Sequence, residues 1–243
     1  MKRLFYSTHK SDTSFEITGE DYRHLLKVLR RKIGDSVDII DGSGYIYNCV
    51  IAEVFKEKII AAIKNSYLGN IPSYRIAIAI SPVKNPSRFE WFVEKAVEIG
   101  ITDIYPVICK RTEKSKIKYE RAIKIMHSAM KQSGNVLEPI LLPSLSFTEM
   151  LQLDDFDSKY IAYISDKIIN NLSSENDLGP SILIAIGPEG GFEKEEASMA
   201  ASQQFKPVSL GDSRLRTETA GVVACQIVKT LDELNRIKTM NAT

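Results

Sequence analysis

The sequence predicts an α/β protein in which a small β-barrel precedes a parallel sheet with helices on both faces. After residue 74, short apolar runs alternate with amphipathic segments, which is the pattern of strands joined by helices in a parallel sheet. Before residue 68, apolar runs are separated by turn residues, and one helical segment interrupts them. Residues 68–73, Leu-Gly-Asn-Ile-Pro-Ser, lack a hydrophobic period and are typical of a linker.

The amino-terminal region is expected to contain a β-hairpin, a further strand and one helix. The turn sequence Asp41–Gly44 separates two apolar runs, which indicates a hairpin with a glycine-bearing loop. Thr18 and Asp21 resemble a capping box. Apolar side chains then recur at helical spacing at Tyr22, Leu25, Leu26 and Leu29. The strands are expected over Val37–Ile40, Tyr45–Ala52 and Ile59–Ile63.

Strands and helices alternate in the region that follows. The expected strands cover Arg75–Ser81, Ile104–Cys109, Tyr160–Ser165, Ile182–Ile186 and Val208–Leu210. The expected helices cover Ser87–Ile99, Tyr119–Ser133, Glu193–Gln204 and about Thr217–Asn235. Asn85 is suited to be an N-cap with Pro86 in the first helical position, and Gly100 and Gly134 are suited to end helices. A capping box, formed by Ser146 and Glu149, indicates another helix start.

The composition indicates a globular cytoplasmic protein. Charged residues make up 26% and hydrophobic residues 44%, which excludes a disordered or fibrous chain. The longest clean apolar runs, Ile76–Ile80 and Ile182–Ile186, are far shorter than the roughly 20 residues that a membrane-spanning helix needs. The amino terminus is basic but lacks an apolar stretch, so we expect no signal peptide. The cysteines and histidines lack the spacing of a disulfide framework or a metal site, so we expect no metal.

The net charge of +1 hides an uneven distribution of charge. Residues 84–135 carry eleven Lys and Arg against six Asp and Glu, whereas residues 136–206 carry four against twelve. One basic cluster comprises Arg23, Lys27, Arg30, Arg31 and Lys32. The other comprises Lys110, Arg111, Lys114, Lys116, Lys118, Arg121, Lys124 and Lys131. Such clusters are either solvated helix faces or contacts for a polyanion, and two of them on a near-neutral chain favour nucleic acid.

The first of two notable loops follows the apolar strand that ends at Ile186. Its sequence, Gly-Pro-Glu-Gly-Gly-Phe over residues 187–192, places three glycines within five residues directly before a helix. Such a loop exposes backbone N–H groups to a ligand, although the same pattern also makes a tight turn. The loop has neither the Gly-Lys-Ser/Thr ending of a phosphate-binding loop nor a dinucleotide fingerprint. We expect Glu189 to fix the loop by accepting hydrogen bonds from main-chain N–H groups.

The second loop runs from Leu210 to the start of the last helix. Arg214 and Arg216 lie in it, and they either bind phosphate or carboxylate or pair with nearby acids. Thr217 or Thr219 is expected to cap the helix. Gly-Asp-Ser at 211–213 resembles the start of some esterases, but no histidine follows it, which argues against hydrolysis.

Together the two loops closely resemble the ribosomal RNA small-subunit methyltransferase E family, which belongs to the SPOUT superfamily of trefoil-knot methyltransferases. The resemblance covers almost the whole chain and rests on residues 187–192, 210–211 and 215–220. Earlier stretches agree with it: His24-Leu25, Val28-Leu29-Arg30, Asp41-Gly42, Gly44, Lys84, Arg88, Glu94-Lys95-Ala96, Glu98-Ile99-Gly100 and Gln132-Ser133 before Pro139. The chain departs from the family where Ser213 replaces a common arginine, with Arg214 one residue later, and where Asn135 replaces another.

The resemblance implies a PUA-like RNA-binding β-barrel over residues 1–70 and a SPOUT methyltransferase domain over residues 74–243. It implies a homodimeric enzyme that transfers a methyl group from S-adenosyl-L-methionine to N3 of a specific uridine of 16S rRNA in the assembled 30S subunit. The implied cofactor-binding residues are Ile186, Gly187, Gly190, Leu210, Gly211, Ser213 and Leu215. The implied RNA-binding residues are Arg23, His24, Arg30, Lys84, Arg88, Lys131 and Gln132.

For catalysis, the resemblance implies that Arg216 faces the reacting uridine or its phosphate. A nearby arginine stabilises the anion that forms when N3 of uridine loses its proton. Glu218 is either the base that takes this proton or a carboxylate at a helix cap or dimer contact. His24 is either an RNA contact or a satisfied buried imidazole. Trp91 is expected on a core helix face with Phe89, Phe92 and Ile99 rather than on a base-stacking platform.

Two other functions stay open at this point. One is a non-catalytic RNA-binding or ribosome-assembly factor that kept the fold, which cofactor binding distinguishes from an enzyme. The other is a SPOUT enzyme that modifies tRNA or a ribose 2′-hydroxyl. The barrel ahead of the catalytic domain and the identity of the target nucleotide separate that enzyme from the family named above.

Overall fold

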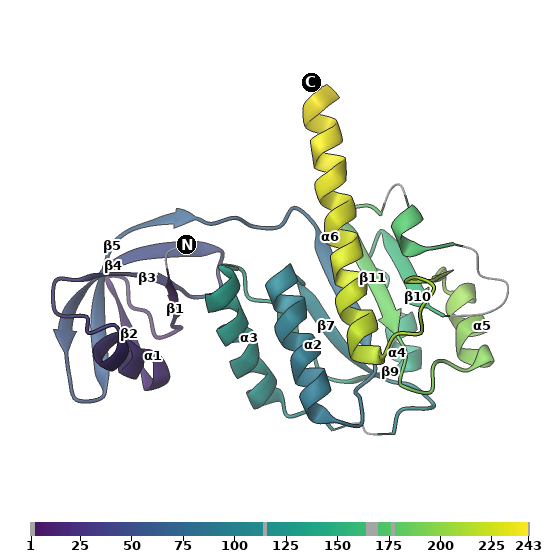
Figure 1. The fold of residues 1–243 in the computed structure, drawn as a ribbon, viewed down its shortest axis with the longest axis horizontal. Coiled ribbons are helices and arrows are strands. Elements are labelled where there is room, and N and C mark those ends of the chain that lie inside the picture. Colours follow the sequence, from purple (N-terminus) through teal and green to yellow (C-terminus); the bar gives the residue numbers. More distant parts are fainter. Residues whose placement is uncertain (1–2, 114–115, 164–169, 176–177, 243) are drawn as a thin grey trace. The chain divides into compact units, whose positions relative to one another are not determined.

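The computed structural model describes residues 3–113, 116–163, 170–175 and 178–242, and the chain divides into two compact units (Figure 1). Met1–Ile71 and His127–Glu138 form the first unit, and Pro72–Met126 and Pro139–Thr243 form the second. The domain bounds expected above, 1–70 and 74–243, stay a prediction. Across the described residues, every helix is too short or too polar to cross a lipid bilayer.

The first unit is built on a five-stranded mixed sheet in the order β1-β3-β4-β5-β2. The strands are β1 (Leu4–Tyr6), β2 (Ser14–Thr18), β3 (Ser36–Ile40), β4 (Tyr45–Val54) and β5 (Lys58–Leu68). The expected hairpin is confirmed, because β3 and β4 pair antiparallel around residues 41–44. Gly44 has a φ of 95°, and a Cβ there would lie 2.8 Å from Cδ1 of Ile71, so this turn requires glycine.

The helix expected after Thr18 starts differently from the prediction. α1 (Gly19–Arg23) continues into a π-helical turn (His24–Val28) that buries Leu25 completely. Thr18 precedes α1, but its side chain makes no capping hydrogen bond, so the predicted capping box is wrong. The backbone of Thr18 pairs with Lys58 in the sheet, and the Asp21 carboxylate contacts Lys131 Nζ at 2.8 Å instead. Sheet pairing and a distant lysine thus replace the local cap.

The segment His127–Glu138 packs into this first unit. The rings of Tyr6 and His127 stack with centroids 3.9 Å apart. The Glu138 carboxylate accepts a hydrogen bond from the Tyr6 hydroxyl at 2.8 Å and lies 2.6 Å from His127 Nε2. The Gly44 N–H donates to the carbonyl of Val136 at 3.0 Å. Residues distant in sequence therefore complete the barrel around a shared carboxylate.

The second unit has a parallel sheet in the order β12-β10-β11-β6-β7-β8, with β9 beside β7. The strands are β6 (Arg75–Ile80), β7 (Asp103–Ile108), β8 (Ile140–Leu141), β9 (Leu145–Ser146), β10 (Ser158–Ala162), β11 (Ser181–Ile186) and β12 (Lys206–Val208). The predicted parallel α/β sheet is confirmed. The last strand begins and ends two residues earlier than expected, and residues 164–165 of the strand expected at 160–165 lie outside the described residues.

Helices cover both faces of this sheet, as predicted. The helices of this unit are α2 (Pro86–Ile99), α4 (Phe147–Leu151), α5 (Lys194–Ser202) and α6 (Thr217–Ala242), with a 3₁₀ turn at Leu172–Ser174. α3 (Tyr119–Ser133) begins in this unit, and its residues from His127 on belong to the first unit. α2 and α6 run side by side over one face (Figure 1), and α4 and α5 bury apolar side chains against the other. A Cβ on Gly221 of α6 would lie 2.6 Å from Cε2 of Phe92, so glycine permits the close approach to α2.

Local signals place the start and end of α2 where they were expected. The Asn85 side chain accepts a hydrogen bond from the Ser87 N–H, Pro86 occupies the first turn, and Gly100 ends the helix with a φ of 113°. The capping box of Ser146 and Glu149 is also present. α6 extends beyond its predicted end at residue 235.

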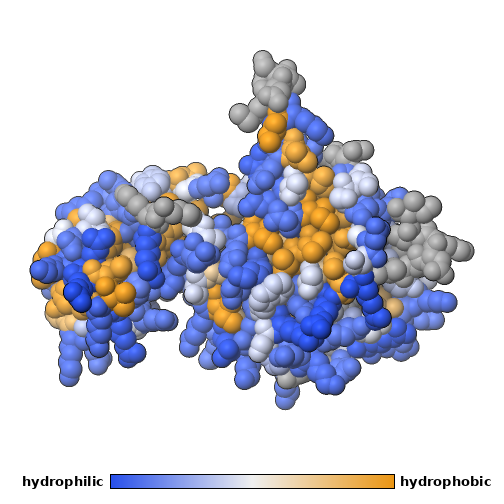
Figure 2. Space-filling view, viewed as in Figure 1, coloured by the Kyte–Doolittle hydropathy of each residue, from blue (hydrophilic) through white to orange (hydrophobic). Residues whose placement is uncertain are grey.

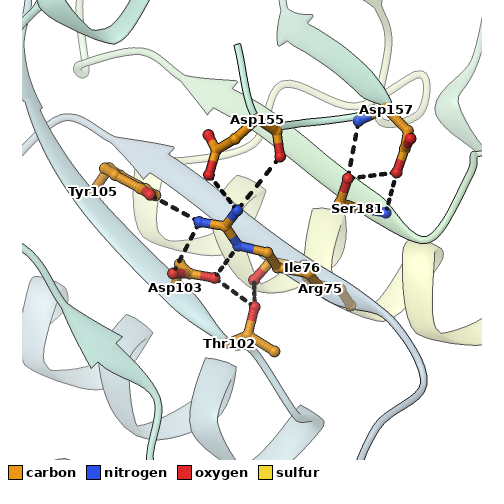
Figure 3. Close-up of polar contacts among 8 residues, drawn as sticks. All are labelled: Arg75, Ile76, Thr102, Asp103, Tyr105, Asp155, Asp157 and Ser181. Carbon is orange, nitrogen blue, oxygen red and sulfur yellow. Dashed lines mark hydrogen bonds and ion pairs between the residues drawn. The ribbon is translucent and has the colours of Figure 1, made fainter. Parts of the chain in front are cut away.

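A polar cluster joins the strands at their amino ends (Figure 3). Arg75 donates to the nearly buried Asp103 from Nε at 2.9 Å and to the exposed Asp155 from Nη1 at 2.6 Å. Its Nη2 also donates to the Tyr105 hydroxyl at 3.1 Å, and its guanidinium lies over the Phe156 ring. One arginine therefore connects β6, β7 and the segment before β10.

We expect Arg75→Met to lower the free energy of unfolding by about 3 kcal/mol, because it leaves the buried Asp103 carboxylate without its cation. Urea denaturation measures this loss. The matched control is Asp155→Asn, which removes the exposed partner of the same arginine and should cost less than about 1 kcal/mol. Equal losses in the two variants would contradict this account of the cluster.

Candidate functional site

The candidate site lies where the parallel strands end. Ligands of open α/β sheets bind at the carboxyl ends of the strands, and the loops after β6, β7 and β11 meet there. The Ser81 N–H donates to the carbonyl of Ile186 at 3.0 Å, which joins the ends of β6 and β11. The hydroxyl groups of Ser81 and Thr112 lie 2.7 Å apart and connect the loop after β7. Three loops are thus held together at one edge of the sheet.

A single hydrogen bond joins the two loops singled out in the sequence. The buried Thr217 donates its hydroxyl to the carbonyl of Gly187 at 2.9 Å. Thr217 or Thr219 was expected to cap the helix, and the Thr217 hydroxyl is directed to the other loop instead. Gly187 is itself confined, because a Cβ there would lie 3.1 Å from the Phe192 ring. The loop after β11 and the start of α6 therefore form one structure.

The loop after β12 keeps part of its backbone open. Gly211 has a φ of 133°, and among the described residues no atom beyond its chain neighbours lies within 4 Å of the position of a Cβ. Ser209 fixes the turn, since its hydroxyl donates to the Gly211 carbonyl at 2.8 Å and its own N–H donates to Asn170. Leu210 and Leu215 are half-buried and Ser213 is exposed. Such a fixed but uncovered backbone suits a ligand that contacts the main chain.

Arg111 holds the glycine loop, whereas the sequence placed it only in the second basic cluster. Its Nη1 donates to the carbonyl of Gly190 at 2.8 Å. The carboxylate of Glu193 lies 2.7 Å from Lys110 Nζ and 3.5 Å from Arg111 Nε. The hydrogen bond that Lys110 donates to this carboxylate lowers the pKa of Glu193. Two members of the second basic cluster, Lys110 and Arg111, are thus paired with Glu193 at the loop. Another member, Lys114, lies outside the described residues.

Glu189 behaves as expected, although its partner belongs to a different loop. Its Oε1 accepts a hydrogen bond from the Lys84 N–H at 2.9 Å. The Lys84 ammonium pairs with Glu113 at 2.9 Å, and this hydrogen bond raises the pKa of Lys84. An open pocket of about 580 Å³ lies here, lined by Lys84, Asn85, Pro86, Arg88, Glu113 and Glu189.

A second pocket of about 320 Å³, called the Trp91 pocket below, is lined by Ser87, Arg88, Trp91, Arg216, Glu218 and Thr219. Glu218 is only 6% exposed, and its Oε1 lies 3.6 Å from Arg88 Nε. Its Oε2 is buried and has no hydrogen-bond partner among the described residues. An acceptor buried without a donor is unfavourable, so this atom is suited to receive a donor from a ligand.

Trp91 is not part of the core, so that prediction was wrong. Phe89 and Phe92 are buried, whereas Trp91 is 41% exposed and lines the pocket. The buried stripe of α2 contains residues 89, 92, 93 and 96, and position 91 lies off this stripe.

The residues expected to bind RNA fall into two groups. Lys84 and Arg88 line the pockets at the loops of the second unit. The others belong to the first unit: Arg23, His24, Arg30, Lys131 and Gln132. Of these, Lys131 pairs with Asp21, and the Nε2 atom of His24 is buried without a hydrogen-bond partner among the described residues. Arg23, Arg30 and Gln132 are exposed.

Two family models match the chain. An RNA methyltransferase domain matches residues 70–229, and an RNA methyltransferase PUA domain matches residues 17–64. A ribosomal RNA small subunit methyltransferase E from Bacillus subtilis is 29% identical over 97% of this chain and 99% of its own length.

Solved structures agree with these matches. A probable rRNA-methyltransferase from Porphyromonas gingivalis is 35% identical, with a TM-score of 0.88 over 96% of this chain and 99% of that one. A ribosomal RNA small subunit methyltransferase E from Neisseria gonorrhoeae, bound to S-adenosyl methionine, is 28% identical, with a TM-score of 0.82 over 95% and 98%. The second unit therefore has the SPOUT fold, and the first is PUA-like. The chain belongs to the ribosomal RNA small-subunit methyltransferase E family of RNA methyltransferases.

Proposed function

We propose that this protein transfers a methyl group from S-adenosyl-L-methionine to N3 of a specific uridine of 16S rRNA, in the assembled 30S subunit in the cytoplasm. The observation that carries the proposal is the junction of the two loops through Thr217 and Gly187, directly beside the pocket that holds Arg216 and Glu218. The cofactor is S-adenosyl-L-methionine, which the relative from Neisseria gonorrhoeae binds.

The joined loops are suited to this cofactor. In the part of the chain that the structure describes, no atom beyond the chain neighbours lies within 4 Å of a Cβ position at Gly191 or Gly211, so a ligand can approach the main chain closely. The residues that would hold it are Ile186, Gly187, Gly190, Leu210, Gly211, Ser213 and Leu215. When bound, S-adenosyl-L-methionine supplies a methyl group activated by its sulfonium.

The protein must then favour the anionic form of N3. Uridine N3–H is a weak acid, so a cation near the base stabilises the charge that develops when the proton leaves. Arg216 lines the pocket and has this role. Glu218 is the base that takes the proton, because its carboxylate lines this pocket and its Oε2 has no hydrogen-bond partner in the described part of the chain, while Oε1 lies near Arg88. This arrangement favours the base over a helix cap for Glu218.

The RNA contacts that we propose lie on both units. Arg23, His24, Arg30, Lys131 and Gln132 contact RNA from the PUA-like barrel, and Lys84 and Arg88 contact it beside the loops. Arginine and lysine neutralise phosphates without reading sequence, so they position the substrate. The seven residues are proposed as a set because their chemistry suits a polyanion.

We also propose that the protein is a homodimer whose contact includes α6. Leu234 and Ile237 lie three residues apart on one face of α6 and are 47% and 54% exposed. Figure 2 shows hydrophobic surface along this helix. A second copy that covers this face would remove these side chains from water.

We expect Arg216→Ala to reduce turnover at least about 100-fold, because it removes the cation that stabilises the N3 anion. The assay follows labelled methyl transfer to small-subunit particles from a strain that lacks this gene, and then maps the modified nucleotide. Wild-type protein should methylate N3 of one uridine, and Arg216→Ala should still bind S-adenosyl-L-methionine.

The matched control is Arg214→Ala, which removes the same charge from the same loop at a residue that does not line the Trp91 pocket, and it should have a much smaller effect. Unchanged methylation by Arg216→Ala would refute the role of this residue. Methylation at another nucleotide or at a ribose would refute the proposed substrate atom, and wild-type protein that binds no cofactor would favour the assembly factor.

For the dimer, we expect Leu234→Glu/Ile237→Glu to sediment as a monomer at concentrations where the wild type is dimeric, because burial of two new charges opposes association. Sedimentation velocity measures this change. Met199→Glu serves as the control, since Met199 is a similarly exposed apolar residue on α5 and should leave the dimer intact. A dimer that survives the double substitution would rule out this face of α6.

A further inference from the structure

We propose that the Trp91 pocket receives the target base of the RNA and that the indole of Trp91 stacks on it. This inference rests on the proposed function, because it assigns a place to the uracil ring that the enzyme would methylate. Trp91 is then a positioning residue for the base, whereas Arg216 and Glu218 act on its charge and its proton.

The size and position of the pocket suit a single base. Its volume of about 320 Å³ lies at the lower end of the range of about 300–1,000 Å³ for small-molecule sites. Enzymes that modify an atom of a base take that base out of its stack and into a pocket. Arg216 belongs to this pocket and follows Leu215 of the proposed cofactor loop, so the base would lie beside the methyl donor.

Position 91 lies off the buried stripe of α2, so the core does not require a large apolar ring there. Its neighbours Phe89 and Phe92 point into the core, whereas the Trp91 side chain is 41% exposed and forms part of the pocket wall. Unstacked RNA bases are commonly bound on aromatic side chains, and tryptophan offers a large ring for this contact. A stacked base would cover this apolar surface.

The charged groups of the pocket complement the edge of uracil. That edge has one N–H donor between two carbonyl acceptors. Arg88 and Arg216 offer donors to the carbonyl oxygens, and the carboxylate of Glu218, which lines the pocket and is 94% buried, offers an acceptor to the N–H. Cytosine presents a bare nitrogen at the same position, which a carboxylate repels. The pocket therefore selects uracil over cytosine.

Trp91 is the single tryptophan of the chain, so its fluorescence reports directly on this pocket. We expect uridine 5′-monophosphate to quench the fluorescence of the wild-type protein in a saturable manner, after correction for absorbance by the nucleotide. Ribose 5-phosphate lacks the base and should leave the fluorescence unchanged, and cytidine 5′-monophosphate should quench at higher concentrations. Equal quenching by all three, or none by the uridine nucleotide, would overturn the inference.

Kinetics provide the second measurement. Trp91→Leu should raise KM for small-subunit particles by about tenfold to hundredfold, while the affinity for S-adenosyl-L-methionine and the midpoint of thermal unfolding stay unchanged. Trp91→Tyr should bring KM most of the way back to the wild-type value, because tyrosine again provides an aromatic ring. A wild-type KM for Trp91→Leu would contradict stacking. So would a KM that is raised equally in Trp91→Leu and Trp91→Tyr.

The two proposals fail in different ways. If the wild type methylates N3 of uridine but neither fluorescence nor KM depends on Trp91, the base lies elsewhere and the proposed function stands. If the uridine nucleotide quenches Trp91 but the mapped methyl group lies on another atom, the pocket stands and the proposed reaction is wrong.

Discussion

The hydrogen bond from Thr217 to the carbonyl of Gly187 is the interaction on which the site depends. It joins the loop after β11 to the first residue of α6, which the chain reaches only after α5 and β12. The parallel sheet brings these segments to the same edge, and the hydrogen bond fixes their separation. It ties the first residue of α6, which follows Arg216 directly, to the glycine loop.

α6 both lines the Trp91 pocket and packs on the rest of the second unit. Its first turn supplies Glu218 to the Trp91 pocket, and Gly221 allows close packing on α2, the helix that carries Arg88 and Trp91. Both walls of the pocket therefore come from two helices in direct contact. The Arg75 cluster joins the strands at the opposite edge of the sheet, where it takes no part in the site.

Local signals predicted much of the fold, and contacts between distant residues account for what they missed. The start of α2 at Asn85 was predictable because the cap lies within two residues of its partner. The capping box predicted at Thr18 is wrong because the backbone of Thr18 pairs with Lys58 of β5 in the sheet. Both loops were identified from their glycines and arginines, but the partner of Thr217 lies 30 residues away and that of Arg111 lies 79 away. Sequence spacing does not predict hydrogen bonds between residues so far apart in the chain. The cofactor was predicted from the resemblance to a family and not from the spacing of residues.

The most direct test of the joined loops is the affinity of Thr217→Val for S-adenosyl-L-methionine, measured by calorimetry. Valine keeps the buried shape but removes the hydroxyl that donates to Gly187, so the dissociation constant should rise about tenfold, the equivalent of one hydrogen bond. Thr219→Val, two residues further along the same helix, should bind the cofactor as the wild type does. A folded Thr217→Val protein with wild-type affinity would show that the cofactor does not depend on the junction of these two loops.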